Sequence, residues 1–237
     1  PRTEVFDYAS YSPSMMAFAA ANDPDLTYET CRFIAEQRRS YGYHWTFNPI
    51  VDLNLNFRNP ITNIRSLGDD TETVLTHATA FIRGFQDGGV MAATAKHFPG
   101  HGDTETDSHS SLAQIPSDSA RLWDVELPPF QKAIDAGVDA VMVAHVNSPD
   151  YQDHAQNPAS LSSFWLQDVL REKMNFDGVI ITDAMRMGGI VKNYSDEYAL
   201  LATVQAGSDI ISQNQNLKKS VDVIEKAVLN GILSENR

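Results

Sequence analysis

The chain has 237 residues, of which 42% are hydrophobic and 21% are charged. This composition is typical of a folded globular protein and excludes an intrinsically disordered chain. The length is sufficient for one domain with a substantial core, so we expect residues 1–237 to form a single domain. A net charge of −13 disfavours nucleic acids and anionic membrane surfaces as partners, and no apolar run approaches membrane-spanning length.

Hydrophobic periodicity and turn residues predict an alternating order of elements. In chain order these are a helix at 25–41, a strand at 43–53, a helix at 71–86, a strand at 89–95, a helix at 119–136, a strand at 137–145, a helix at 158–174, a strand at 179–182, a helix at 198–206, a strand at 209–212 and a helix at 218–230. Pro128 must kink or restart the helix in which it lies. The alternation favours parallel β/α units.

The stretch from Lys96 to His109 contains three histidines, three carboxylates and one lysine. It follows the apolar strand predicted at 89–95. In β/α folds, catalytic residues commonly lie on loops that a rigid strand holds in position. Asp52, His145 and Asp183 also lie at the C-terminal ends of predicted strands. Together these positions indicate the active face of a (β/α)8 barrel. An open doubly wound sheet also binds at its strand ends, but no glycine-rich nucleotide loop follows any strand.

Three motifs carry a resemblance to a known family. The segment Lys96–His109 reads Lys-His-Phe-Pro-Gly-His-Gly-Asp-Thr-x-x-Asp-Ser-His and resembles the signature of family 3 glycoside hydrolases, in the β-N-acetylglucosaminidase branch. Residues 176–187 resemble the strand of that family that carries the nucleophile. Residues 47–68 contain a third match, with Phe-Asn-Pro-Ile-Val-Asp near its start. The resemblance extends from about Met16 to Gly207.

The resemblance implies a (β/α)8 TIM barrel, of which this chain predicts about five strands where a barrel needs about eight. An earlier family segment, Asp-x-Glu-Gly-Gly followed by an arginine, does not occur in this sequence. We therefore expect an incomplete barrel whose N-terminal strands, and the native N-terminus, are missing from the chain.

The resemblance also implies the catalytic residues. Asp183 would attack the sugar and form a covalent glycosyl-enzyme, although Ala184 replaces the second acidic residue that the family usually has. His109, oriented by Asp107, would act as general acid and base, because the pKa of histidine lies near neutrality. Taken by themselves, Asp107 and His109 could equally form a local turn and a solvated side chain.

Further residues are expected to form the pocket. The resemblance implies that Arg65, Lys96 and His97 bind sugar hydroxyls. We expect His145 to line the pocket wall, and Asp52 either to do the same or to bond to the loop that carries Arg58 and Arg65. His101 and Asp103 are expected to shape the loop. No metal and no cofactor is expected.

The function implied is a retaining β-N-acetylhexosaminidase that releases terminal β-linked N-acetylglucosamine from peptidoglycan fragments or chitooligosaccharides. β-Glucosidase or N-acetylglucosaminide phosphorylase activity are alternatives within the family. A metal-dependent hydrolase with ligands among His97, His101, Asp103, Asp107 and His109, or an inactive carbohydrate-binding protein, are alternatives of another class. We expect a carbohydrate substrate, no nucleic-acid or membrane partner, and a monomer. The bacterial cytoplasm and periplasm both stay open as the compartment.

Overall fold

The computed structural model describes residues 12–116, 119–148, 157–214 and 216–235. Its α-helices are α1 (Met15–Ala20), α2 (Pro24–Ser40), α3 (Thr71–Gln86), α4 (Ser119–Arg121), α5 (Pro128–Asp135), α6 (Gly188–Val191), α7 (Asp196–Ala206) and α8 (Leu217–Leu229). Its strands are β1 (Thr94–Phe98), β2 (Ala113–Gln114), β3 (Ala140–Val143), β4 (Val146–Asn147) and β5 (Val179–Thr182). Short 3-10 turns and the wider helical turns η3 (Leu122–Glu126) and η5 (Phe164–Lys173) complete it.

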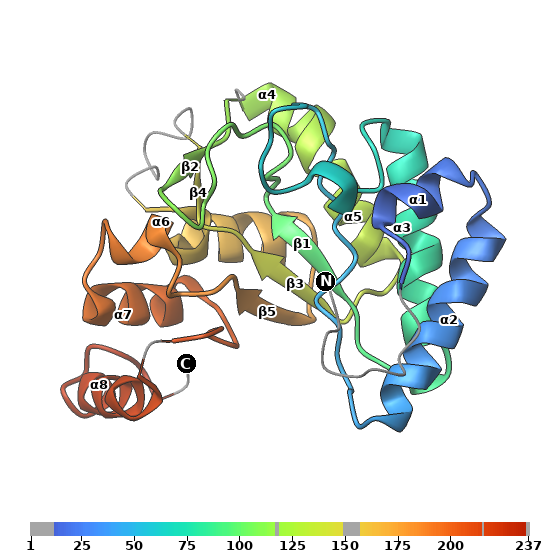
Figure 1. The fold of residues 1–237 in the computed structure, drawn as a ribbon. Coiled ribbons are helices and arrows are strands. Elements are labelled where there is room, and N and C mark those ends of the chain that lie inside the picture. Colours follow the sequence, from blue (N-terminus) through green and yellow to red (C-terminus); the bar gives the residue numbers. More distant parts are fainter. Residues whose placement is uncertain (1–11, 117–118, 149–156, 215, 236–237) are drawn as a thin grey trace.

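The centre of the molecule is a parallel sheet in the order β1-β3-β5. Thr94 of β1 lies opposite Ala140 of β3, and Ala140 in turn lies opposite Val179 of β5. The register between β1 and β3 shifts between Lys96 and Phe98. Figure 1 shows the three strands side by side, with α2 and α3 at one end and α7 and α8 at the other.

Two of the predicted strands pair with this part of the chain only through isolated bridges, and the segment at 43–53 has a further one between Trp45 and Ala92, just before β1. Ile50 pairs with Lys96 on the outer side of β1, and Ile210 pairs with Ile181 on the outer side of β5. The prediction of a continuous strand at 43–53 was therefore wrong, and Pro49 gives a reason, because proline has no amide N–H to donate to a ladder. Five parallel segments nevertheless follow one another in sequence order across the sheet, and the described residues form no closed barrel.

A second small sheet was not predicted. In it β2 pairs with β4 in parallel, with Ala113 opposite Val146. The amide of Ile115 also donates to the carbonyl of Asn147 at 2.9 Å. Two-residue strands are too short to leave a periodic signal in the sequence, but this pair fastens the end of the loop after β1 to the segment after β3.

Local signals explain the helices well. The carboxylate of Asp70 accepts a hydrogen bond from Thr73 N at 2.8 Å, so it caps α3, which spans the predicted range. The predicted restart at Pro128 is confirmed, because η3 ends at Glu126 and α5 begins at Pro128. None of the helices in the described ranges is both long and apolar enough to cross a membrane.

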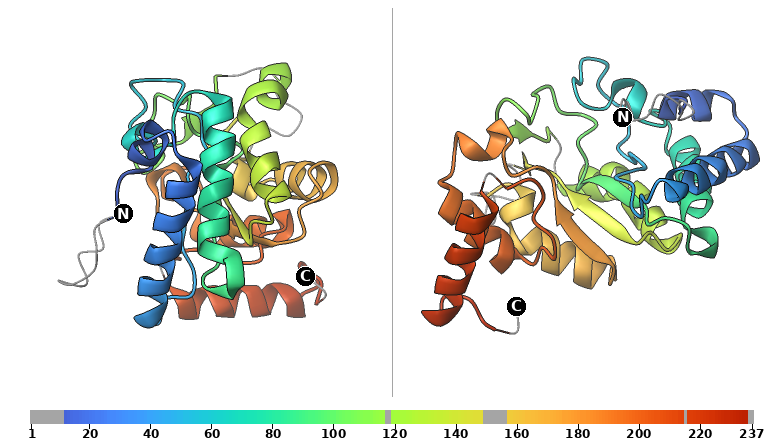
Figure 2. Two further views of the ribbon diagram at one scale, coloured as in Figure 1. Left: turned by 90° about the vertical axis from the view of Figure 1, so that its right-hand side faces the viewer. Right: turned by 60° about the horizontal axis from the view of Figure 1, so that its bottom comes forward.

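The main core lies between the sheet and its helices. Phe98 of β1 is fully buried, and its ring lies edge-on to Phe130 of α5 at 5.4 Å and to Trp165 of η5 at 6.0 Å between centroids. Helices α2 and α3 pack side by side, as the left view of Figure 2 shows. Gly84 of α3 makes this close approach possible: a Cβ there would lie 2.7 Å from Cys31 Cβ and from the Tyr28 carbonyl oxygen.

Gly84→Ala is therefore expected to destabilise the protein, although alanine is the better helix former. The added methyl group must push α2 and α3 apart, which costs about 1–3 kcal/mol. Urea denaturation measures the free energy of unfolding. Thr76→Ala, on the exposed face of the same helix, is the matched control and should change this free energy by less than about 0.5 kcal/mol. An equally stable Gly84→Ala protein would contradict the packing described.

A buried histidine in α3 should make stability depend on pH. His77 is 1% exposed and its Nδ1 lies 2.8 Å from Thr27 Oγ1 of α2. Burial lowers the pKa of His77 below 6.5, while Asp23 opposes this shift. As the pH falls below about 6.5, the unfolded chain therefore takes up a proton before the folded one does, and stability is lost.

Between pH 7.5 and 5.5, we expect the free energy of unfolding to fall less for His77→Gln than for the unmodified protein. The difference between the two slopes should be at most about 1.4 kcal/mol per pH unit, the effect of one proton. Urea titrations at the two pH values give the comparison. His44→Gln, at an exposed position, should keep the original pH dependence. Parallel pH profiles for all three proteins would show that His77 is not held neutral by the fold.

Candidate active site

Four polar segments follow parallel strand segments and therefore meet at one edge of the sheet. They are the segment after Asp52, the loop after β1, the segment after β3 and the segment after β5. In Figure 1 this edge is the one to which the arrowheads of β1, β3 and β5 point. The predicted site residues all lie in or next to these segments.

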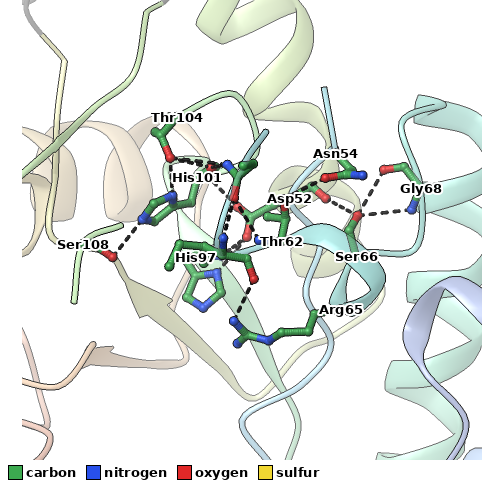
Figure 3. Close-up of polar contacts among 12 residues, drawn as sticks. Asp52, Asn54, Thr62, Arg65, Ser66, Gly68, His97, His101, Thr104 and Ser108 are labelled. Carbon is green, nitrogen blue, oxygen red and sulfur yellow. Dashed lines mark hydrogen bonds and ion pairs between the residues drawn. The ribbon is translucent and has the colours of Figure 1, made fainter. Parts of the chain in front are cut away.

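Asp52 connects the first two segments. Its Oδ1 accepts a hydrogen bond from His101 N at 2.8 Å, and its Oδ2 accepts from His97 N at 3.0 Å and contacts His97 Nδ1 at 2.7 Å. Figure 3 shows these contacts. Burial raises the pKa of Asp52, but His97 and the hydrogen bonds outweigh it and hold the pKa below its ordinary value.

Asp52 was expected either to line the pocket wall or to bond to the loop that carries Arg58 and Arg65, and of these the bond to the loop is observed. The residue is 2% exposed and both carboxylate oxygens are engaged by His97 and His101. Only its backbone carbonyl meets that loop, through Ser66 Oγ at 2.7 Å. Asp52 holds other site residues in place.

Lys96 and His97 lie within β1, not beyond its end as predicted. His97 is 4% exposed and its Nδ1 is engaged by Asp52, so only Nε2 is left for another partner. Burial and the charge of Arg65 lower the pKa of Lys96 to about 8, while Asp183 and Asp52 oppose the shift. Lys96 is thus mostly a cation at neutral pH, with a pKa about one unit above that pH.

His101 is a neutral, fully buried residue. Its Nδ1 lies 2.6 Å from Thr104 Oγ1, and its Nε2 lies 2.9 Å from Ser108 Oγ, as Figure 3 shows. Burial, aided by His97, lowers the pKa of His101 to about 4. The expectation that His101 shapes the loop is confirmed by these contacts.

The other end of the same loop carries Asp107 and His109. Asp107 Oδ1 accepts from His109 N at 2.8 Å and contacts His109 Nδ1 at 2.8 Å, so the two side chains meet as expected from their spacing. The side chains stay exposed, 61% for His109 and 41% for Asp107. Burial raises the pKa of Asp107, but the hydrogen bonds from His109 outweigh it and lower the pKa.

Asp183 lies at the end of β5. Its amide donates to the carbonyl of Val143 at 2.9 Å, and its Oδ1 accepts from Ala184 N at 2.7 Å. Burial raises the pKa of Asp183, but His97, His145, the Ala184 amide and Lys96 outweigh it and leave the pKa below its ordinary value. A carboxylate held ionised while mostly shielded from water is suited to act as a nucleophile.

The prediction of a pocket-wall contact for His145 is corrected. His145 is fully buried, and both ring nitrogens have protein partners, Ser160 Oγ at 2.7 Å and the Ala184 carbonyl oxygen at 3.0 Å. Because Ala184 follows Asp183, His145 fixes the turn that carries the Asp183 carboxylate. Burial lowers the pKa of His145, against the charge of Asp183.

A cavity of about 530 Å³ brings three of the predicted residues together: Arg65, Lys96 and His109. Arg65 is held there by a hydrogen bond from its Nη1 to the Ile61 carbonyl at 2.8 Å. This volume suits a small ligand. Asp183 and His97 do not line the cavity. Asp183 nevertheless lies close enough to Lys96 to shift the pKa of the lysine, and His97 lies close enough to Asp183 to shift the pKa of the carboxyl group. A hollow of about 570 Å³ beside α7 contains none of the predicted site residues.

The ligand types proposed for a metal do not gather around one point. Within the described ranges no group of three His, Cys, Asp or Glu side chains could hold a metal ion. The histidines have other partners: His97 contacts Asp52, His101 contacts Thr104 and Ser108, and His109 contacts Asp107.

Two contacts of the loop were missed by sequence reasoning. Arg121 Nη2 contacts Asp103 Oδ2 at 2.6 Å and Glu126 Oε1 at 3.3 Å, so it fastens the start of the loop to η3. Gly188 and Gly189 contact its other end, and two adjacent glycines soon after Asp183 were the signal available in the sequence.

Known proteins share this arrangement of segments. A relative from Cellulomonas fimi, described as a beta-N-acetylglucosaminidase/beta-glucosidase, is 33% identical over 99% of this chain and 43% of its own length. The structure of a family 3 beta-N-acetylglucosaminidase from Paenibacillus sp. str. FPU-7 is 41% identical and has a TM-score of 0.91, covering 96% of this chain and 44% of that one. The structure of a beta-glucoside phosphorylase, BglX, bound to 2FGlc is 29% identical with a TM-score of 0.92, covering 97% and 42%.

The chain spans less than half the length of each of these three proteins. The sequence profile of the glycosyl hydrolase family 3 N terminal domain matches residues 2–237. The chain therefore belongs to glycosyl hydrolase family 3, of which it carries the N-terminal domain.

Proposed function

We propose that this chain carries the catalytic centre of a retaining glycoside hydrolase that releases terminal β-linked N-acetylglucosamine. One observation carries the proposal: His109, hydrogen-bonded to Asp107, lines the same cavity as Lys96 and Arg65, and Lys96 lies close enough to Asp183 to interact with its charge. The names of the Cellulomonas and Paenibacillus proteins support this sugar. The proposed substrates are peptidoglycan fragments or chitooligosaccharides.

The reaction would take two steps. In the first, Asp183 attacks the anomeric carbon while His109 donates a proton to the leaving oxygen, which gives a covalent glycosyl-enzyme. In the second, His109 removes a proton from water, and the water displaces Asp183 with overall retention. Asp107 supports both steps, because its carboxylate stabilises the charged imidazole and fixes which ring nitrogen faces the substrate.

Sugar binding would fall to Arg65, Lys96 and His97. The cationic side chains of Arg65 and Lys96 supply hydrogen-bond donors on the cavity wall. His97 can contribute through Nε2, since Asp52 engages its Nδ1. Asp52 and His145 would act through the residues they hold, as their burial requires.

We also propose that the five parallel segments are part of a (β/α)8 barrel, incomplete within the described residues, and that residues 1–237 act as one domain of a monomer. The sequence order of the segments across the sheet supports this arrangement. A barrel places its chemistry at the carboxyl ends of its strands, which is where Asp183 lies and where the Asp107–His109 loop begins.

Phosphorolysis is a second candidate for the same site. The BglX structure is named as a beta-glucoside phosphorylase, and an imidazole acid repels an incoming phosphate less than a carboxylate acid would. The two activities are separated by assaying an aryl β-N-acetylglucosaminide and an aryl β-glucoside, each with and without inorganic phosphate. Sugar 1-phosphate as the main product would favour the phosphorylase, and free sugar the hydrolase.

Asp183→Ala is expected to reduce kcat by about 10³-fold or more on an aryl β-N-acetylglucosaminide, because no covalent intermediate can form. The protein that contains this chain is assayed at saturating substrate, with circular dichroism as a check on folding. Asp177→Ala removes an exposed carboxylate six residues earlier and should leave kcat within about twofold. Full activity of Asp183→Ala would remove the nucleophile assignment.

His109→Ala should slow substrates in proportion to their need for a proton. For an N-acetylglucosaminide with a poor leaving group, kcat/KM is expected to fall by about 10²-fold or more. For a dinitrophenyl glycoside, whose leaving group needs little protonation, the fall should be about threefold at most. Glu105→Gln alters an exposed carboxylate in the same loop and serves as the control. Equal losses on both substrates would show that His109 is not the acid.

A further inference from the structure

The segment that follows Asp183 is joined to the backbone of the Asp107–His109 loop. Gly188 N, at the start of α6, donates to the carbonyl of His109 at 2.9 Å, and Gly189 N donates to the carbonyl of Ser108 at 3.1 Å. The first amides of a helix have no partner within the helix. Here the carbonyls of the loop satisfy two of them, so the two segments stabilise each other.

The loop is held from its inner side as well. Ser108 is 1% exposed although it lies between the exposed side chains of Asp107 and His109. Its hydroxyl reaches Nε2 of the buried His101 at 2.9 Å. The side chain and the backbone of Ser108 therefore both hold the part of the chain from which His109, the proposed general acid and base, projects.

Gly188 sits too close to the loop for any side chain. A Cβ at this position would lie 2.5 Å from the Ser110 carbonyl oxygen and 2.7 Å from the His109 carbonyl oxygen. Gly189 is less crowded, since its Cβ would lie 3.2 Å from the Ser108 carbonyl oxygen. Neither glycine has a positive φ, so alanine fits the backbone conformation at both.

The backbone between Asp183 and Gly188 is short and is fixed by hydrogen bonds. Met187 N donates to the Ala184 carbonyl at 2.9 Å, and Met185 N donates to the Ser212 carbonyl at 3.0 Å. The Ala184 carbonyl also meets His145 Nε2. A shift at Gly188 would therefore move the loop relative to Asp183 more readily than it would move Asp183 itself.

We propose that Gly188 and Ser108 are positioning residues that set the Asp107–His109 pair at its working distance from Asp183. This inference rests on the proposed function, because it assigns the two residues a part in the same reaction. They would act through the backbone of His109, without touching substrate. A displaced His109 would lose proton transfer while Asp183 kept its place.

The test compares Gly188→Ala with Gly189→Ala in the protein that contains this chain. Gly188→Ala is expected to lower kcat/KM by about 10-fold or more for an N-acetylglucosaminide with a poor leaving group, and by about threefold at most for the dinitrophenyl glycoside. KM for the poor leaving group should stay within about twofold, and added azide, which needs no general base, should raise turnover of the dinitrophenyl substrate. Both variants keep the amide N–H, but the Cβ of Gly189→Ala would lie 3.2 Å from its nearest neighbours instead of 2.5 Å, so Gly189→Ala should stay within about threefold of the unmodified enzyme on both substrates.

Ser108→Ala provides a second variant in case Gly188→Ala does not fold. It removes only the hydroxyl that reaches His101 and should give the same dependence on the leaving group, with Ser111→Ala, at an exposed position, as its control. Equal losses on both substrates in these variants, or equal effects of Gly188→Ala and Gly189→Ala, would overturn the positioning role while the glycosidase stands. An unmodified protein that cleaves no β-glycoside would overturn the proposed function and this inference with it.

Discussion

The buried carboxylate of Asp52 is the interaction on which the rest of the site depends. It gathers two amides and one imidazole from a stretch of five residues, 97–101, and so fixes how the chain leaves β1. An ionised carboxylate at 2% exposure would be costly without these donors. The donors in turn have their positions imposed by Asp52, so the bend after β1 and the charge of Asp52 sustain each other.

Burial divides the ionisable residues of the site into two groups. His101 and His145 are buried with hydrogen-bonding partners at both ring nitrogens, and burial keeps them neutral. Asp52 and Asp183 stay ionised because histidines and amides oppose the cost of burial. His109 is the exception, since it projects into solvent on a held backbone. A group that must exchange protons with substrate and water needs such access.

Whether a feature of this arrangement could be predicted from the sequence depends on how far apart in the chain the interacting residues lie. Helix α3 was predicted over its full length, because its apolar face and its Asp70 cap are local signals. The contact of Asp107 with His109 was also predicted, since it spans only two residues. The side-chain partners of Asp52 and His145 were not predicted, because they lie 15 to 49 residues away in the chain. The strand at 43–53 was overestimated because Pro49 interrupts its hydrogen bonding, and the end of β1 was missed because Lys96 and His97 do not resemble strand residues.

The contact between Gly188 and His109 has a consequence for the exchange of parts between related proteins. Segments 99–112 and 183–190 are far apart in the chain but share one interface, in which backbone atoms meet at distances that leave no room for a Cβ at Gly188. A loop transplanted from a relative would arrive without its matching surface unless the second segment came with it. The two segments would therefore have to be exchanged together, and substitutions in one are constrained by the shape of the other.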